Sequence, residues 1–215
     1  MERNFEFSQL TSAMLELARR SLATIVPVFF ALFAVGFAIE FYFPDGIWIG
    51  IVIAIAQFVI CYFLAKGLAQ HVGLIGEGET GPGFGSYFGV AFLVGLGTAI
   101  GFLLLVIPGI VLTVRWLLAF PAVFAGGNSP ISKSWEMTGP VFWKLLAAYI
   151  IGMLLIGVTF LAYSYAYDAD QTVHIAALAV ANAAAAANSI YSFLLGFAGF
   201  VLLRDDSAAL EEVFG

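Results

Sequence analysis

Long apolar runs separated by short polar breaks dominate the chain. Six runs are candidates for membrane crossings: Ser21–Phe43, Ile47–Gln70, Ser86–Ile107, Ile110–Gly126, Val141–Ala166 and Val173–Leu203. An α-helix needs about 20 apolar residues to cross roughly 30 Å of hydrocarbon. Open strands would leave backbone groups unpaired in lipid. The pattern therefore predicts an all-α fold, a polytopic transmembrane bundle of six helices.

The break at Pro108-Gly109 is a helix stop that can be tested by length. One helix from Ser86 to Gly126 would be about 60 Å long, twice the thickness of the hydrocarbon. The chain must therefore turn back, either between two full crossings or in a re-entrant hairpin. Both arrangements leave Gly85 and Asn128 on the same side of the membrane. The last run is about 46 Å long as a helix, which predicts tilt or a projecting first turn.

Two short helices are expected outside the crossings. Within residues 1–20, apolar positions recur at mostly helical spacing between Phe7 and Arg20, which predicts an amphipathic interfacial segment. Ser129 can cap a second short helix that begins at Pro130 and ends at Gly139. The remaining organisation is a transmembrane domain over residues 21–203 and a C-terminal tail over residues 204–215.

Composition and charge exclude several classes of protein and orient the bundle. Hydrophobic residues make up 62% of the 215 residues and charged residues only 10%, which excludes a soluble enzyme, a nucleic-acid binder and a disordered protein. With six crossings, seven cations fall on one side: Arg3, Arg19, Arg20, Lys66, Lys133, Lys144 and Arg204. Positive loops stay cytoplasmic, so both termini are predicted to be cytoplasmic. Trp48, Trp135 and Trp143 are expected to be interfacial anchors.

Arg115 is the basic residue well inside an apolar run, and charges there usually mark a function or a partner. Counted from Ile110 it lies near the outer boundary, at a depth similar to that of Glu40, so an ion pair between the two is possible. The alternatives are that Arg115 reaches the outer headgroups and organises packing, or that it forms part of a substrate or lipid-headgroup site.

The last run carries a polar stripe of Asn182, Asn188, Ser189 and Ser192 among alanines. These side chains are interpreted as hydrogen-bonding contacts between helices, with a polar pathway as the alternative. Gly85-x-x-x-Gly89 and Gly97-x-x-x-Gly101 offer close-approach surfaces on the third crossing, for packing within the chain or for a homo-oligomer.

The sequence gives little support for a catalytic site or a metal site. Asp168, Asp170 and His174 could ligate a divalent cation, but Asp170 as an N-cap, with acids favoured near a helix start, explains them with fewer assumptions. The chain has no H-E-x-x-H or G-x-S-x-G motif. All fourteen acidic residues lie near helix ends or in loops, which argues against an ion-coupled carrier. We therefore predict no enzyme and no cofactor.

The middle of the chain carries a recognisable motif. Residues 107–116 (IPGIVLTVRW), Phe120-Pro121, residues 130–135 (PISKSW) and residues 142–144 (FWK) resemble bacterial multi-span membrane proteins related to the membrane domain of some glycerophosphodiester phosphodiesterases. The resemblance covers about residues 95–155, although the segment with Lys133 and Lys144 is poorer in arginine than is usual. It implies a six-helix bundle in a bacterial inner membrane. It does not imply phosphodiester hydrolysis, because the residues for that reaction would lie in a soluble domain.

Two functions are consistent with these features. The first is a non-enzymatic integral inner-membrane protein that packs with membrane lipids or with another membrane protein. The alternative is a small transporter or channel for an uncharged or amphipathic solute, with Arg115, Asn182 and Asn188 around a central cavity. A bundle interior filled by side chains would count against the alternative.

Overall fold

The structure is a computed structural model that describes residues 5–43, 47–76, 79–126, 129–166 and 174–204, apart from the side chains of residues 47–50. These residues form helices and no strands. The helices are α1 Phe7–Arg20, α2 Leu22–Tyr42, α3 Ile47–His71, α4 Phe84–Leu104, α5 Val106–Trp116, α6 Ala119–Phe124, α7 Pro130–Thr138, α8 Phe142–Ala166 and α9 Ile175–Leu203. Six segments are long and apolar enough to cross a membrane, with α5 and α6 together forming the fourth. The predicted six-helix membrane bundle is confirmed.

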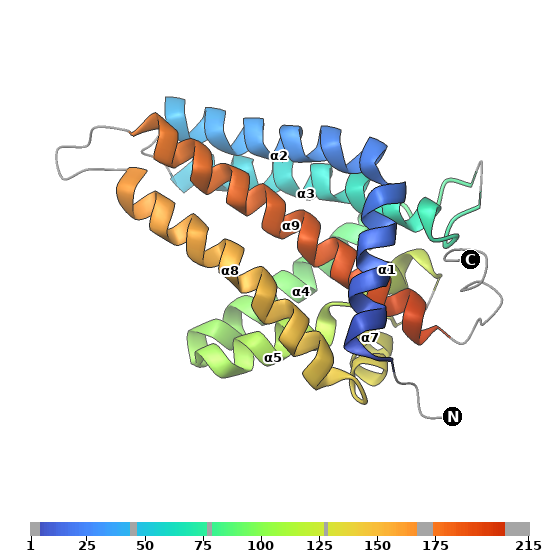
Figure 1. Ribbon diagram of the computed structural model, residues 1–215. Coiled ribbons are helices and arrows are strands. Elements are labelled where there is room, and N and C mark those ends of the chain that lie inside the picture. The colour runs from blue at the N-terminus through green and yellow to red at the C-terminus, as the bar shows by residue number, and fades with distance from the viewer. Residues whose placement is uncertain (1–4, 44–46, 77–78, 127–128, 167–173, 205–215) are drawn as a thin grey trace.

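Helix α9 is the centre of the bundle. It lies between α2 and α8, and α1 crosses it near its C-terminal end (Figure 1). It also contacts α3 and α6. Most of its second half is buried, including Leu195, Phe197 and Phe200, which are inaccessible to solvent. The alanines and glycines of α9 permit this arrangement, because small side chains let several helices approach one axis.

The chain turns back earlier than the sequence predicts. Helix α4 ends at Leu104, Leu105 is extended with φ −166° and ψ 151°, and α5 begins at Val106. Pro108 therefore lies in the first turn of α5, where its fixed φ and missing N–H are tolerated. Gly109 allows α5 to pack closely on α4, because its backbone lies against Gly101 of α4. The predicted stop at Pro108-Gly109 is wrong by three residues.

The predicted fourth crossing is interrupted as well. Helix α5 ends at Trp116 and α6 begins at Ala119. Pro121 explains the break, because a proline ring clashes with the carbonyl group four residues earlier, which here belongs to Leu117. At this interruption the Leu117 carbonyl lies close to Gly196 of α9.

Both predicted short helices are present. Helix α1 buries the face formed by Leu10, Ala13, Met14 and Leu17, and it packs mainly on α9. Helix α7 has Ser129 as its N-cap residue, Pro130 in its first turn and a C-cap at Gly139. The apolar face of α1 therefore covers the end of the bundle instead of facing lipid alone.

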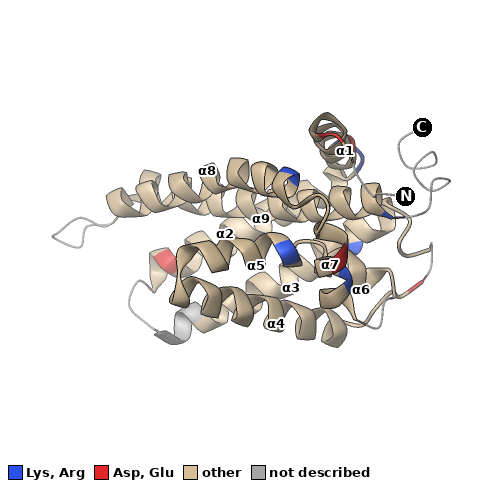
Figure 2. Cartoon of the chain, turned by 90° about the horizontal axis from the view of Figure 1, so that it is seen from below, with Lys and Arg blue, Asp and Glu red and all other residues tan. Residues whose placement is uncertain are grey.

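The described Lys and Arg residues gather at the end of the molecule where α1 and α7 lie, which we call the basic end (Figure 2). An acidic position of α2 lies at the opposite end. This distribution agrees with the charge pattern from which cytoplasmic termini are predicted. It departs from the prediction for Arg115, which lies beside α7 at the basic end. The turn at Leu105 explains the difference, because ten residues of helix bring the chain back by about 15 Å.

Candidate functional site

Glu40 has other partners than Arg115, the one that the sequence left possible. Its carboxylate accepts hydrogen bonds from the Tyr163 hydroxyl, at 2.6 and 2.7 Å to the two oxygens, and from Asn182 Nδ2 at 2.7 Å. The ion pair with Arg115 that the sequence left possible does not form, since Arg115 contacts Trp135 and Phe142 at the basic end. We call Glu40, Tyr163 and Asn182 the Glu40 cluster. It ties α2, α8 and α9 together.

Asn182 is the best-packed member of the Glu40 cluster. Its side chain is only 5% exposed, and Nδ2 also donates to the Leu178 carbonyl at 3.1 Å. Oδ1 lies against Gly36 of α2, in the space that a Cβ atom there would occupy. The interpretation of Asn182 as a hydrogen-bonding contact between helices is correct for this residue, and Gly36 makes the close approach possible.

A cavity of about 290 Å³ opens beside Asn182, between α2, α3, α8 and α9. We call it the polar cavity. Its lining consists of Leu32, Gln57, Ile156, Thr159, Phe160, Asn182, Ala185, Ala186, Asn188 and Ser189. Half of these side chains are polar and none is charged. The volume is near the lower limit of ligand pockets in proteins, so the polar cavity suits a small ligand.

Two amides in the polar cavity lack partners. Within the described part of the chain, the side chains of Gln57 and Asn188 make no hydrogen bond with another residue. The hydroxyls of Thr159 and Ser189 donate to Leu155 and Ala185 in their own helices, which leaves their oxygens able to accept. Both residues are half-buried. A molecule in the polar cavity that supplies both donors and acceptors could hydrogen-bond these amides, and a hydrogen bond of this kind contributes about 1 kcal/mol.

Gln57 also lines a second space, which we call the aromatic cavity. It measures about 220 Å³ and is lined by Ala54, Gln57, Phe58, Cys61, Tyr87, Phe120 and Phe193. Apart from Gln57 and the phenol of Tyr87, its walls are apolar. The shared residue places a hydrogen-bonding space next to an apolar one, an arrangement that matches an amphipathic molecule.

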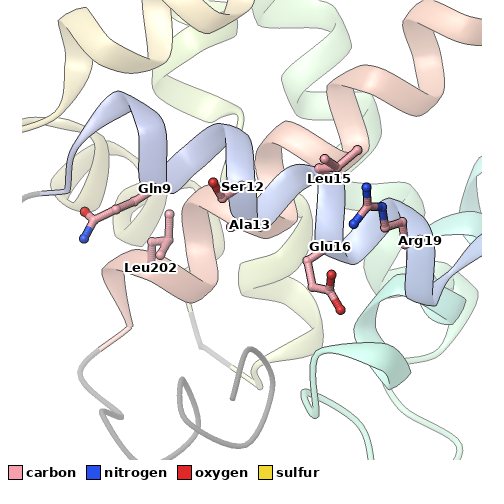
Figure 3. A pocket seen from close by; sticks show the side chains of 7 residues that line it. All are labelled: Gln9, Ser12, Ala13, Leu15, Glu16, Arg19 and Leu202. Carbon is pink, nitrogen blue, oxygen red and sulfur yellow. The ribbon is translucent and has the colours of Figure 1, made fainter.

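The largest cavity described, about 480 Å³, is a groove at the surface of the basic end (Figure 3). Residues of α1 line one side, among them Gln9, Glu16 and Arg19, and Leu202 of α9 lines the other. Glu16 is already paired with Arg20 at 2.7 Å. Because this groove lies along the exposed polar face of α1, it is a less specific candidate than a polar cavity between membrane spans.

The remaining site residues predicted from the sequence are the tryptophans and the residues of the possible metal site. Trp135 of α7 and Trp143 of α8 are 43% and 77% exposed, and their role as interfacial anchors stays a prediction. The side chain of Trp48 lies outside the described residues. Asp168 and Asp170 also lie outside them, so the metal alternative with His174 is untested. His174 is the N-cap residue of α9. In the described ranges, no cluster of His, Cys, Asp and Glu could hold a metal ion.

Sequence reasoning missed three residues of this region. Gln57 had a usable signal, because an amide in the middle of an apolar run needs a polar partner. Thr159 and Tyr163 are four residues apart on α8 and therefore share one face, but Tyr163 belongs to a run of tyrosines that is typical of an aromatic belt. Nothing in the sequence identifies Glu40 as its acceptor.

Known proteins provide no independent evidence about the site. The resemblance of residues 95–155 to membrane domains of glycerophosphodiester phosphodiesterases depends on their motif and stays a prediction. No protein-family model, no curated protein and no solved structure matches this chain.

Proposed function

We propose that this integral membrane protein is a small, non-enzymatic transporter or channel that binds an uncharged amphipathic solute in the polar cavity. The single observation that carries the proposal is the pair of unpartnered amides, Gln57 and Asn188, in a cavity without charged walls. Amide and hydroxyl groups select by hydrogen bonding, and the absence of a charge in the lining gives an ion no counter-ion. Placement in a bacterial inner membrane with cytoplasmic termini is part of the same proposal.

The adjoining aromatic cavity supports the amphipathic character of the solute. A hydrogen-bonding head would contact Gln57 and Asn188, while an apolar chain would lie against Phe58 and Phe193. Burial of an apolar chain contributes about 0.8 kcal/mol per CH₂ group. A monoacylglycerol has both parts and no charge, so it is a suitable probe of the proposed site.

Filling the polar cavity is expected to abolish binding. We expect a photoreactive monoacylglycerol in proteoliposomes to label peptides of α3 and α9, and unlabelled monoacylglycerol to compete. Ala185→Leu places a larger side chain in the cavity and should reduce labelling about tenfold or more, equivalent to about 1.4 kcal/mol. Mass spectrometry of the labelled peptides measures the effect.

The matched control is Ala176→Leu, because Ala176 is exposed on the same helix and lies outside the cavity lining. Its labelling should equal that of the unmodified protein. Equal labelling of Ala185→Leu would contradict the proposal. For the transport step, monoacylglycerol should leave vesicles that contain the protein faster than empty vesicles, and Ala185→Leu should remove the difference.

A second candidate function, packing with another membrane protein or with a second copy of this chain, is favoured by the surface of α4. Gly97 and Gly101 are used within the chain, against Trp116 and Leu112. In contrast, Cβ atoms on Gly85 or Gly89 would meet open space. This exposed glycine pair has the spacing through which membrane helices associate.

A larger side chain at the exposed glycine pair, Gly85 and Gly89, is expected to disrupt self-association of the protein. Gly89→Leu should shift the protein from oligomer to monomer, because the side chain prevents close approach of two α4 helices. Single-molecule photobleaching in vesicles counts the subunits. Gly157→Leu is the matched control, since Gly157 of α8 also faces open space. A monomeric parent protein, or identical counts for both variants, would exclude a homo-oligomer through α4.

A further inference from the structure

Arg115 is held in place by three helices that the chain brings together at the basic end. Its guanidinium carbon lies 5.0 Å from the ring centroid of Trp135 on α7 and 5.1 Å from that of Phe142 on α8. The Arg115 carbonyl accepts a hydrogen bond from Ser134 Oγ at 2.8 Å, and the Thr138 hydroxyl, which donates to the Ser134 carbonyl at 2.8 Å, lies beside it. Both the backbone and the side chain of Arg115 are therefore fixed.

Most of the hydrogen-bonding capacity of Arg115 is unused. A guanidinium has five N–H donors, and the described residues receive one bond from it, from Nη1 to the Trp135 carbonyl at 3.3 Å. No described carboxylate lies within ion-pair distance of it; Glu136 on α7 instead accepts from Ser132 at 3.5 Å. A cation that no described carboxylate neutralises, held beside two aromatic rings, attracts an anion.

Arg115 is only half-buried, so its guanidinium is accessible from outside the bundle. A Cβ atom at Gly139 would lie 3.3 Å from Nη1, so a larger residue there would crowd the guanidinium. The exposed rings of Trp135 and Trp143 flank the site on α7 and α8. Tryptophan side chains at the ends of membrane spans lie at the level of the lipid headgroups. An anion that reaches Arg115 at this depth is most readily supplied by a phospholipid.

We propose that Arg115 binds the phosphate group of an anionic phospholipid, with Trp135 and Phe142 holding the guanidinium in position. The planar fork of an arginine matches two phosphate oxygens, which a lysine ammonium does not. Basic sites at membrane surfaces recognise anionic headgroups in this way. This site is separate from the polar cavity, and neither proposal depends on the other.

The test measures how much phosphatidylglycerol and phosphatidylcholine the purified protein retains from vesicles that contain both, by native mass spectrometry. The parent protein should retain phosphatidylglycerol preferentially. Arg115→Gln should lower this preference about fivefold or more, and Arg115→Lys, which keeps the charge, should fall between the two. Arg20→Gln is the matched control, because it removes a cation from the exposed surface of α1 at the same end.

Three results would overturn the proposal: equal retention of the two lipids by the parent protein, an unchanged preference in Arg115→Gln, or an equal loss in Arg20→Gln. If Arg115→Gln does not fold, as judged by circular dichroism, the comparison of Arg115→Lys with the parent protein decides. Inorganic phosphate is added in a separate arm. Displacement of phosphatidylglycerol by it would identify a soluble phosphate ligand and overturn the assignment to lipid.

Discussion

Replacement of Gly196 by alanine is expected to lower the free energy of unfolding by about 3 kcal/mol, a large effect for a single methyl group. An added Cβ atom would lie 2.7 Å from the carbonyl oxygen of Leu117. That oxygen belongs to the backbone between α5 and α6, where Pro121 interrupts the helix, so it cannot rotate away. Chemical or SDS unfolding in mild detergent, followed by circular dichroism, measures the change.

Gly199→Ala is the matched control on the same buried helix. There the nearest atoms to an added Cβ are Cδ2 of Leu118 at 3.3 Å and Cδ2 of Leu145 at 3.4 Å. Both are ends of flexible side chains that can shift by a few tenths of an ångström, and alanine gains up to about 1 kcal/mol over glycine in helix propensity. The expected change is therefore below about 1 kcal/mol. Equal destabilisation by the two variants would show that α9 does not approach the Leu117 backbone.

The second large effect is expected at the Glu40 cluster. Glu40→Ala removes the acceptor of Tyr163 and Asn182 together and should lower the free energy of unfolding by about 1–3 kcal/mol. Tyr163→Phe alone should cost about 1 kcal/mol, and less in the Glu40→Ala background, because the hydroxyl has then already lost this acceptor. The same unfolding measurement on the two single variants and the double variant gives the coupling.

Glu16→Ala serves as the control for the loss of a carboxylate. Glu16 forms an exposed pair with Arg20 on α1, and pairs of this kind contribute less than about 1 kcal/mol. Strictly additive effects of Glu40→Ala and Tyr163→Phe would show that the two side chains do not interact in the membrane.

Both expected losses of stability involve α9, on which the packing of the bundle depends. Glycines at two levels of the molecule let it approach other segments, Gly36 of α2 near one end and Gly196 near the other. Between these levels α9 is less tightly covered, and the polar cavity opens there beside Asn188. The proposed binding site is therefore a gap between two regions of close packing, which explains how a small bundle can hold a preformed cavity.

The helices could be predicted from the sequence because their formation in lipid is a local requirement. Every backbone group must be satisfied within its own segment, so a long apolar run is sufficient to predict a span. Helix α1 begins and ends at the predicted residues, α2 is one residue shorter at each end, and α8 begins one residue later. The larger errors, the displaced turn and the interrupted fourth span, occur at Pro108 and Pro121, because a proline can either begin a helix or end one and the local sequence does not distinguish these outcomes.

The partners of the polar residues could not be predicted in the same way. Glu40 and Asn182 are separated by 142 positions, and Arg115 was assigned to the wrong end because its depth depends on where the chain turns. Hydrophobicity and charge along the chain determined the six spans and the gathering of cations at one end. Tertiary packing alone decided that Glu40 meets Tyr163 and Asn182, that Arg115 meets Trp135, and that Gln57 and Asn188 share a cavity. The physical reason is that partition into lipid depends on each segment separately, whereas a hydrogen bond between helices depends on the rotation and depth of both.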